Sequence, residues 1–378
     1  MKAETKRRKK IIFLSSDTGG GHRATCDALI TAIEKVSPGK YELKRVEFFE
    51  RGNPFISKCI CKFYSWVMSR CNWLWGMIYH LSNTWLVWAA IQPFYGVLRK
   101  NIRNMVEEED PDLIVSIHPM VNQLMRKVLG SMERQIHYGI VTSDPVMLHR
   151  GWIEPSAEFI VVSSPQAEER ALKLGAPKER VKRLGLPINP IFYEHDLDKE
   201  RIRKEFGLKK GQYTILFSGG GDGGGKIFPI VEKLLAEKLA IQVVVACGRN
   251  DELREKLSKM GVVALPFTKK MHELMCVIDL MVIKAGPGTI EESATKGIPM
   301  IITSYLPGQE ARNVEYAKSI GRAFYEPDTA GAVKRIKEEL QNKAGKTKPI
   351  PKSDAPVYRI AKFLISVIEK NPKAAKYK

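Results

Sequence analysis

The stretch IIFLSSDTGGGHRATCDALITAIEK (residues 11–35) limits the folds open to this chain more than any other feature. It begins with a short apolar run, of the kind that is buried on both faces of a parallel sheet. Three glycines follow at 19–21, and glycine can adopt positive φ angles and let a ligand approach the backbone closely. Apolar residues then recur at helical spacing, at Ala28, Leu29, Ala32 and Ile33. The stretch is therefore typical of a strand, a tight loop and a helix.

This junction favours the binding of an anion, because the start of a helix offers unpaired amides and the positive end of its dipole. A plain connecting turn is the alternative. The loop is not a Walker A motif, since no Gly-Lys-Ser or Gly-Lys-Thr follows, and GGGH lacks the third glycine of the dinucleotide fingerprint. His22, directly after the glycines, needs another explanation.

Similar apolar runs alternate with helix-length segments along the rest of the chain. We expect strands within 112–119, 136–144, 158–164, 213–225, 241–248, 261–267, 279–289 and 298–303, and helices within 226–239 and 251–260. A glycine-rich loop opens each half of the chain, and the polar stretch 194–212 lies between the halves. Alternating strands and helices, with a glycine-rich loop at the start of each half and a polar stretch between the halves, favour two doubly wound α/β domains.

Charge and cysteine content limit the cellular compartment and the kinds of binding partner, but they do not identify one partner. The net charge of +19 indicates a polyanionic neighbour such as nucleic acid, an anionic membrane face or a phosphorylated substrate. No zinc finger, RNA-binding aromatic signature or helix-turn-helix pattern is present, so we expect no nucleic acid partner. The six cysteines lack Cys-x-x-Cys spacing, and the basic run 6–10 is followed by too short an apolar run for a signal peptide. We therefore expect a reduced, cytoplasmic setting.

Residues 55–105 contain all but one of the six tryptophans, and no Lys, Arg, Asp or Glu occurs from 71 to 98. Tryptophan and basic residues together are typical of helices that lie at a membrane interface. Core helices of the first domain are an alternative, and a membrane span is disfavoured by polar residues within the segment. For acceptor or membrane contact the candidates are Trp66, Trp73, Trp75, Trp85, Trp88, Arg70, Arg99 and Lys100.

The stretch KAGPGTIEESATKGIPMIITSYLPGQEARNVEY (284–316) carries the most specific pattern. A strand that ends in a tight turn and a helix start suits a diphosphate, with Thr289 adding a hydroxyl donor. Either Glu291 or Glu292 could accept the hydroxyls of a ribose, with a surface capping role as the alternative. Gln309 and Glu310 follow the next strand, where they could contact sugar hydroxyls.

Taken together, the motifs SDTGGGHRAT, SIHP, VTSD, GGGDGGG, CGRN and KAGPGTIEES…PGQEARNVEY resemble the monogalactosyldiacylglycerol synthases and bacterial diacylglycerol glucosyltransferases of glycosyltransferase family 28. The resemblance covers roughly 10–325. It implies a GT-B fold with two Rossmann-like domains facing a cleft, and a C-terminal helix that crosses back to the first domain. We therefore expect an N-terminal acceptor domain over 1–195, a nucleotide-sugar domain over 210–350 and the returning helix over 356–378.

The same resemblance implies an inverting, metal-independent transfer of a hexose from UDP-glucose or UDP-galactose to diacylglycerol, with no cofactor, on the inner face of the cell membrane. An anionic membrane surface would be a partner. For donor binding the candidates are Gly20, Gly21, Gly220, Phe267, Gly288, Thr289, Ile290, Glu292, Gln309, Glu310 and Asn313. Glu291 departs from the family, whose members tend to have a small residue there, and VTSDPVMLHRGW is looser than the plant pattern.

His22 matches the family's histidine after the glycine triplet. Transfer needs a base for the acceptor hydroxyl, and the unperturbed pKa of histidine suits that role. We hypothesise that His22 removes the proton or orients the acceptor, with Asp17 or Asp144 assisting. The alternative is a histidine that binds the diphosphate or caps the loop.

Three other functions remain open from the sequence. The same fold could act on another lipid, such as a polyprenyl-linked intermediate. It could be a UDP-sugar epimerase, which would not need the tryptophan-rich segment. It could also be a lipid-binding protein without enzymatic activity, although the presence of the motif residues argues against this.

Overall fold

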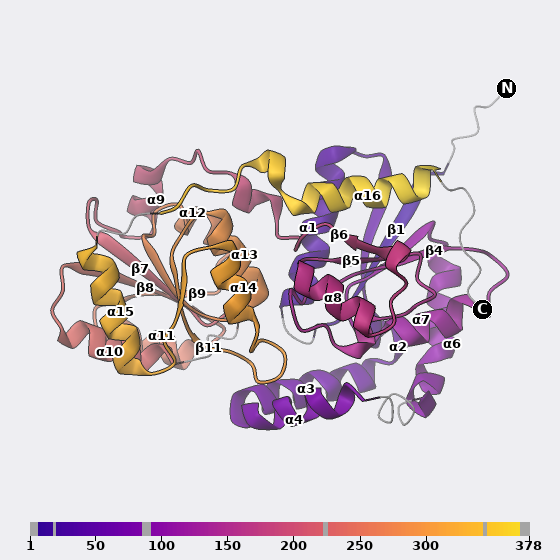
Figure 1. The fold of residues 1–378 in the computed structure, drawn as a ribbon, viewed down its shortest axis with the longest axis horizontal. Helices are drawn as coiled ribbons and strands as arrows, with labels where there is room; N and C mark the ends of the chain where they lie inside the picture. The colour runs from indigo at the N-terminus through magenta and orange to yellow at the C-terminus, as the bar shows by residue number, and fades with distance from the viewer. Residues whose placement is uncertain (1–6, 18–19, 85–91, 222–225, 343–345, 371–378) are drawn as a thin grey trace. The chain divides into compact units, whose positions relative to one another are not determined.

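The structure is a computed structural model that describes residues 7–17, 20–84, 92–221, 226–342 and 346–370. It divides into two compact units (Figure 1). Unit 1 runs to Pro190 and resumes at Pro356, whereas unit 2 comprises Ile191–Ala355.

Unit 1 contains a parallel sheet of six strands in the order β2-β1-β3-β4-β5-β6. Its strands are β1 (Lys9–Ser15), β2 (Tyr41–Glu47), β3 (Leu113–Ser116), β4 (His137–Val141), β5 (Phe159–Val162) and β6 (Val181–Arg183). The apolar residues of β1 pair in register with both neighbours, for example Ile12 with Lys44 and with Ile114. Residues 11–14 are fully buried, as expected for a central strand covered on both faces.

Helices cover both faces of this sheet. The helices described in unit 1 are α1 (Gly21–Val36), α2 (Phe48–Gly52), α3 (Pro54–Arg70), α4 (Asn72–Ser82), α6 (Gln92–Glu109), α7 (Asn122–Leu129), α8 (Pro165–Lys173) and α16 (Pro356–Lys370), with short 3-10 turns η1 (Arg150–Trp152) and η2 (Lys178–Arg180). Of these, α3 packs on α2, and α4 packs on α3. One hydrophobic core joins β1, β3, β4 and β5 to α2, α6 and α7.

The C-terminal helix α16 packs on α1 in unit 1, which confirms the expected return of the chain. Its apolar stripe, Val357, Ile360, Ala361 and Leu364, is fully buried. The helix is also fixed by polar contacts, because the Tyr41 hydroxyl donates to Glu369 (2.8 Å) and Lys9 Nζ donates to the Ile368 carbonyl (2.6 Å).

Unit 2 contains a second parallel sheet of six strands in the order β12-β11-β10-β7-β8-β9. Its strands are β7 (Tyr213–Ser218), β8 (Ile241–Gly248), β9 (Val263–Pro266), β10 (Leu280–Lys284), β11 (Met300–Ser304) and β12 (Ala323–Tyr325). Its helices are α9 (Lys199–Glu205), α10 (Ile227–Ala236), α11 (Asp251–Ser258), α12 (Met271–Leu274), α13 (Pro287–Thr295), α14 (Asn313–Ile320) and α15 (Thr329–Gln341), with 3-10 turns η3 (Pro190–Tyr193) and η4 (Lys352–Asp354).

The strand orders identify where a ligand would bind in each unit. Numbered within unit 2, the strands follow 3-2-1-4-5-6, the order of dinucleotide-binding folds, and the chain reverses direction across the sheet between β7 and β10. In unit 1 the reversal lies between β1 and β3. Ligands of open α/β sheets bind beyond the carboxyl ends of the strands at such reversals. The two glycine loops, after β1 and after β7, start at these two points.

Candidate functional site

His22 lies at the start of α1, beyond the carboxyl end of β1. The helix begins after Gly20 and has no side-chain cap. The His22 Nδ1 atom is 3.1 Å from the Ser143 hydroxyl, in hydrogen-bond contact, and Ser143 follows β4. The His118 ring, beyond the end of β3, meets the His22 ring edge-on with centroids 4.7 Å apart, and the Trp152 ring lies 5.9 Å away. Three strand ends and η1 therefore converge on one imidazole.

Burial keeps this imidazole neutral. Desolvation lowers the pKa of His22 to about 4, against the opposing effect of a hydrogen bond to the backbone of Ile117. Desolvation also lowers the pKa of His118 well below its usual range, and the nearby His22 and His149 add to this. Near neutral pH, His22 is thus an uncharged ring, and the one nitrogen that carries no hydrogen can accept a proton.

The two acidic residues expected to assist His22 lie in different surroundings. Asp144 is buried and accepts a hydrogen bond from Trp152 Nε1 (2.6 Å), so it reaches the His22 cluster through the Trp152 ring. Asp17 is exposed beyond the end of β1, where its amide donates to Glu47 Oε1 (3.3 Å). Among the contacts described for His22, neither carboxylate is a partner.

Sequence reasoning missed two members of the His22 cluster. Ser143 lies within the VTSD motif, and its position directly after a predicted strand is the signal that could have found it. Phe49, whose ring contacts His118 with centroids 5.7 Å apart, comes from α2, and no pattern in the sequence indicated it. His149 has a different partner, because its Nε2 is in contact with the Ser82 hydroxyl (3.1 Å).

In unit 2 the corresponding position is the N-terminus of α13. Gly286 precedes the helix without a side-chain cap and Pro287 occupies its first turn, so the amides of Gly288 and Thr289 have no partner within the helix. A Cβ atom added to Gly288 would meet nothing within 4 Å, so the space in front of it is open. Gly220, with φ of +78°, follows β7 and neighbours the Lys284 side chain.

Lys284, at the end of β10, adds a positive charge to this position. Its side chain runs under Gly220, where an added Cβ would lie 3.3 Å from Lys284 Cε, and near Gly286, where it would lie 3.8 Å from Nζ. Lys284 Nζ forms an ion pair with Glu310 Oε1 (2.9 Å). Glu310 is buried, and its other oxygen accepts from the Leu306 amide (2.9 Å). Glu310 thus fixes Lys284 in place.

The two neighbouring glutamates of α13 differ in their contacts. Glu291 is buried and accepts a hydrogen bond from the Tyr316 hydroxyl, and desolvation raises the pKa of its carboxyl to about 7. Glu292 is half-buried, and desolvation raises the pKa of its carboxyl to about 8. Within the described part of the chain no hydrogen bond or ion pair is recorded for the Glu292 side chain, which leaves its oxygens available to a ligand.

The remaining donor candidates surround the same loops. Asn313 Nδ2 donates to the Ala285 carbonyl (2.9 Å), and Asn313 Oδ1 is buried without a partner among the described residues. Gln309 is half-buried beyond the end of β11, and Phe267, beyond the end of β9, is 55% exposed. All three lie on the carboxyl side of the unit 2 sheet, as α13 does.

The tryptophan-rich segment forms α3 and α4, which pack against each other. Their exposed large apolar side chains are Phe55 (74%), Phe63 (52%), Trp66 (49%), Trp73 (65%), Met77 (49%) and Leu81 (59%), and we call this set the apolar surface. Trp75 instead is half-buried and packs edge-on against the Tyr64 ring, with centroids 5.2 Å apart. Arg99 and Lys100 are exposed on α6. Trp85, Trp88 and the Arg70 side chain lie outside the described residues.

None of the helices described is long and apolar enough to cross a membrane. No group of three or more His, Cys, Asp or Glu side chains is arranged to hold a metal ion in the part of the chain that the structure describes.

Sequence comparison finds two family models along the chain. One described as monogalactosyldiacylglycerol (MGDG) synthase matches residues 22–188, and one described as glycosyltransferase family 28 C-terminal domain matches residues 214–362. Monogalactosyldiacylglycerol synthase 1 of Arabidopsis thaliana is 31% identical over 336 residues, which are 84% of this chain and 62% of that protein. The probable monogalactosyldiacylglycerol synthase 2 of Oryza sativa subsp. japonica is 30% identical over 361 residues, 87% of this chain and 73% of that protein. This chain thus spans less than two thirds of the Arabidopsis protein.

Solved structures share the fold at low identity. MurG of Acinetobacter baumannii matches with a TM-score of 0.56 and 13% identity, covering 96% of this chain and 100% of that chain. The S. aureus MnaA–UDP complex matches with a TM-score of 0.60 and 13% identity, covering 98% of this chain and 99% of that chain. Together with the two six-stranded parallel sheets, these matches confirm the expected GT-B fold.

Proposed function

This chain belongs to the monogalactosyldiacylglycerol synthase family of glycosyltransferases, and from this we propose that it transfers a hexose from a UDP-sugar to diacylglycerol at a membrane surface. The observation that carries the proposal is the uncapped start of α13 beside Lys284. Departure of UDP concentrates negative charge on its diphosphate, and a fixed lysine with two free amides stabilises that charge without moving. Glu292, whose carboxyl has no recorded partner, accepts the ribose hydroxyls.

His22 acts on the acceptor in this proposal. The unprotonated nitrogen of its neutral ring takes the proton from the diacylglycerol hydroxyl as the oxygen attacks the anomeric carbon, while the contacts with Ser143 and the Ile117 backbone fix the ring. One displacement on the face opposite the departing UDP inverts the anomeric centre. The charge on the diphosphate is met by the helix start and Lys284, so the transfer proceeds without a metal ion.

The apolar surface of α3 and α4 supports a lipid acceptor. Aromatic side chains that are about half exposed are suited to the interface of a bilayer, where one end of the ring is wet. Lys58 and Lys62 are exposed on α3 among them and would meet anionic headgroups. We therefore place the protein peripherally on an anionic membrane, such as the inner face of a cell membrane. An epimerase acting on a soluble sugar nucleotide would have no use for this surface.

Incubation of the protein with radiolabelled UDP-glucose or UDP-galactose and vesicles that contain diacylglycerol tests the function. We expect a labelled glycolipid of inverted anomeric configuration, and the same yield after chelation of divalent metals. Vesicles that carry a polyprenyl phosphate in place of diacylglycerol test the other lipid acceptor. The absence of a lipid product with both donors and both acceptors, under conditions where the protein binds vesicles, would refute the proposal.

A further inference from the structure

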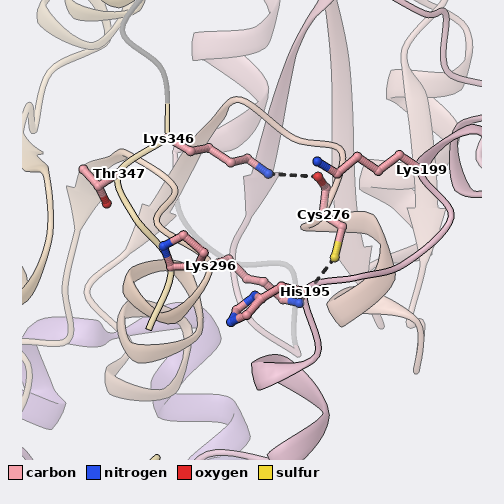
Figure 2. Close-up of a pocket in the computed structure, with 7 residues that line it drawn as sticks. His195, Lys199, Cys276, Lys296, Lys346 and Thr347 are labelled. Carbon is pink, nitrogen blue, oxygen red and sulfur yellow. Dashed lines mark hydrogen bonds between the residues drawn. The ribbon is translucent and has the colours of Figure 1, made fainter. Parts of the chain in front are cut away.

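Unit 2 contains a second candidate site, at the opposite end of its strands from the first turn of α13. A cavity of about 180 Å³ lies there, and Figure 2 shows the side chains that line it. Its lining includes His195, Lys199, Cys276, Lys296, Lys346 and Thr347. Cys276 precedes β10 and Lys296 precedes β11, so the cavity lies toward the amino ends of these strands. The proposed donor site lies beyond their carboxyl ends.

Lys296 is the strongest indication of a missing partner. The residue is only 4% exposed, and its ammonium donates to the Glu194 carbonyl and to Cys276 Sγ (3.3 Å). An ammonium has three donors, so one remains. No ion pair between Lys296 and a carboxylate occurs among the described residues. Burial of an ammonium without a counter-charge is costly, which favours an anion in the cavity.

Two further lysines face the same space. Lys346 Nζ donates to the carbonyls of Met275 (2.9 Å) and Cys276 (3.0 Å), and desolvation lowers its pKa to about 8. Lys199 lines the cavity too, and its ammonium has no recorded hydrogen bond or ion pair in the described chain. The C-terminus of α13 is the negative end of its helix dipole and repels an anion with only about half an elementary charge. The positive charges of three lysines outweigh this repulsion.

We propose that this cavity binds the phosphate group of a small soluble phosphate, with Lys199, Lys296 and Lys346 as its counter-charges. A volume of about 180 Å³ corresponds to roughly six water molecules, enough for one phosphate group with a short substituent. A lipid phosphate would need an apolar surface beside the cavity. The exposed large apolar side chains of unit 2, Phe267 and Tyr305, instead lie beyond the carboxyl ends of β9 and β11.

The cavity joins the two segments through which the chain enters and leaves unit 2. His195 and Lys199 come from the entering segment, and residues 346–350 belong to the leaving one. The leaving segment is already fixed to the end of α13, because the Thr347 amide donates to the Gly297 carbonyl (2.8 Å). It also contacts the entering segment, because His195 Nε2 lies 2.9 Å from the Ile350 carbonyl. A bound phosphate therefore ties both segments to α13 and slows their exchange with solvent. This inference does not depend on the proposed transferase activity.

Isothermal titration of the protein with inorganic phosphate and with glycerol 3-phosphate tests the proposal, in the presence of saturating UDP to occupy the donor loop. We expect one bound phosphate per chain, and an affinity weakened about tenfold or more by either Lys199→Gln or Lys346→Gln. Lys233→Gln, on the exposed side of α10, removes the same charge elsewhere and should leave the affinity unchanged. Circular dichroism establishes that each variant is folded. Equal affinity in all four proteins, or no binding to the wild type, overturns the proposal.

Two further arms make the test specific. Hydrogen exchange should slow in 191–199 and 346–355 when phosphate is added to the wild type, and not in Lys346→Gln. Vesicles that carry a phosphomonoester lipid distinguish a lipid phosphate from a soluble one. If the protein binds these vesicles in a manner that depends on Lys346, and binds neither inorganic phosphate nor glycerol 3-phosphate, the proposal of a soluble ligand is refuted.

The pH dependence supplies an independent readout. The titratable groups around Lys346 are Cys276, Asp279, Lys199 and Lys296. Because the pKa of Lys346 is lowered to about 8, its side chain loses its positive charge as the pH rises above 8. Phosphate affinity should therefore fall as the pH rises from 7 to 9, and Lys346→Gln should remove most of this fall. An unchanged pH profile in the variant contradicts the role of Lys346.

Discussion

The protonation of His22 offers the sharpest test of the proposed chemistry. A base acts only in its neutral form, and burial lowers the pKa of His22 from 6.5 to about 4. At pH 5.5 a histidine with a pKa of about 4 is roughly 97% neutral, whereas one with a pKa of 6.5 is only about 9% neutral. The site therefore predicts that kcat/KM changes little from pH 7 to pH 5.5, and an exposed base predicts about a tenfold loss.

The assay is the initial rate of glycolipid formation at subsaturating donor across pH 4.5–8. His22→Ala should lower kcat by about 10²- to 10⁴-fold at every pH, the usual contribution of a general base. His22→Gln tests orientation alone, because an amide can hold the acceptor but cannot take its proton. A near-normal kcat in His22→Gln, or an acid limb centred near pH 6.5 in the wild type, would refute the reasoning.

Folding must be monitored in the same experiment, because burial also lowers the pKa of His149 to about 4. Below pH 6.5 the unfolded chain binds protons at His22, His149 and His118, whose pKa is also lowered by burial, while the folded chain binds none at His22 and His149 until near pH 4. The unfolding free energy is therefore unaffected above pH 6.5 and decreases as the pH falls through this window, by up to about 3 kcal/mol for each of His22 and His149 and further for His118. Circular dichroism at each pH separates this loss of stability from loss of the base.

Three further predictions concern other parts of the molecule. Lys284→Gln should raise KM for the UDP-sugar by about tenfold or more, since it removes a charged donor to the diphosphate, and an unchanged KM would exclude that contact. Trp66→Ser and Trp73→Ser should each weaken binding to anionic vesicles, measured by sedimentation, by about tenfold, because each exposed ring buries its apolar area in the interface. The binding should also fall as salt is added. Vesicle binding that responds neither to the substitutions nor to salt contradicts the membrane surface. Gly297→Ala should lower the unfolding free energy by about 1–3 kcal/mol in chemical denaturation, because Gly297 has φ of +68° and an added Cβ would lie 2.2 Å from the Thr347 carbonyl oxygen; a neutral substitution would show that 346–350 can move aside.

Nine of the twelve strands described could be predicted from the sequence, because each is a continuous apolar run that lies within a parallel sheet. The stretches that form β2, β6 and β12 carried no such signal. In β2, YELKRVE mixes charged and apolar residues because the strand is at the sheet edge, and only its Tyr41 and Val46 are buried. Strands β6 and β12 are three residues long and also at the edges, so pairing rather than composition defines them.

For the candidate site, motif positions were easier to predict than side-chain partners. The glycine loops and His22 follow from local sequence, since a strand end and a helix start are adjacent in the chain. The contact between His22 and Ser143 joins residues 121 positions apart, and it depends on which strands become neighbours in the sheet. Trp75 was grouped with the membrane candidates, yet its ring packs against Tyr64, because composition does not reveal which side of a helix faces its neighbour.

The packing of α16 on α1 has a consequence for biosynthesis. The face of α1 that α16 covers stays uncovered until the final helix leaves the ribosome, although the rest of unit 1 has emerged by Pro190. At about 5–20 residues per second, translation of unit 2 delays this closure by roughly 10–35 s. During that interval a nascent-chain chaperone could bind the uncovered stripe, and truncation before Pro356 should leave unit 1 dependent on such help.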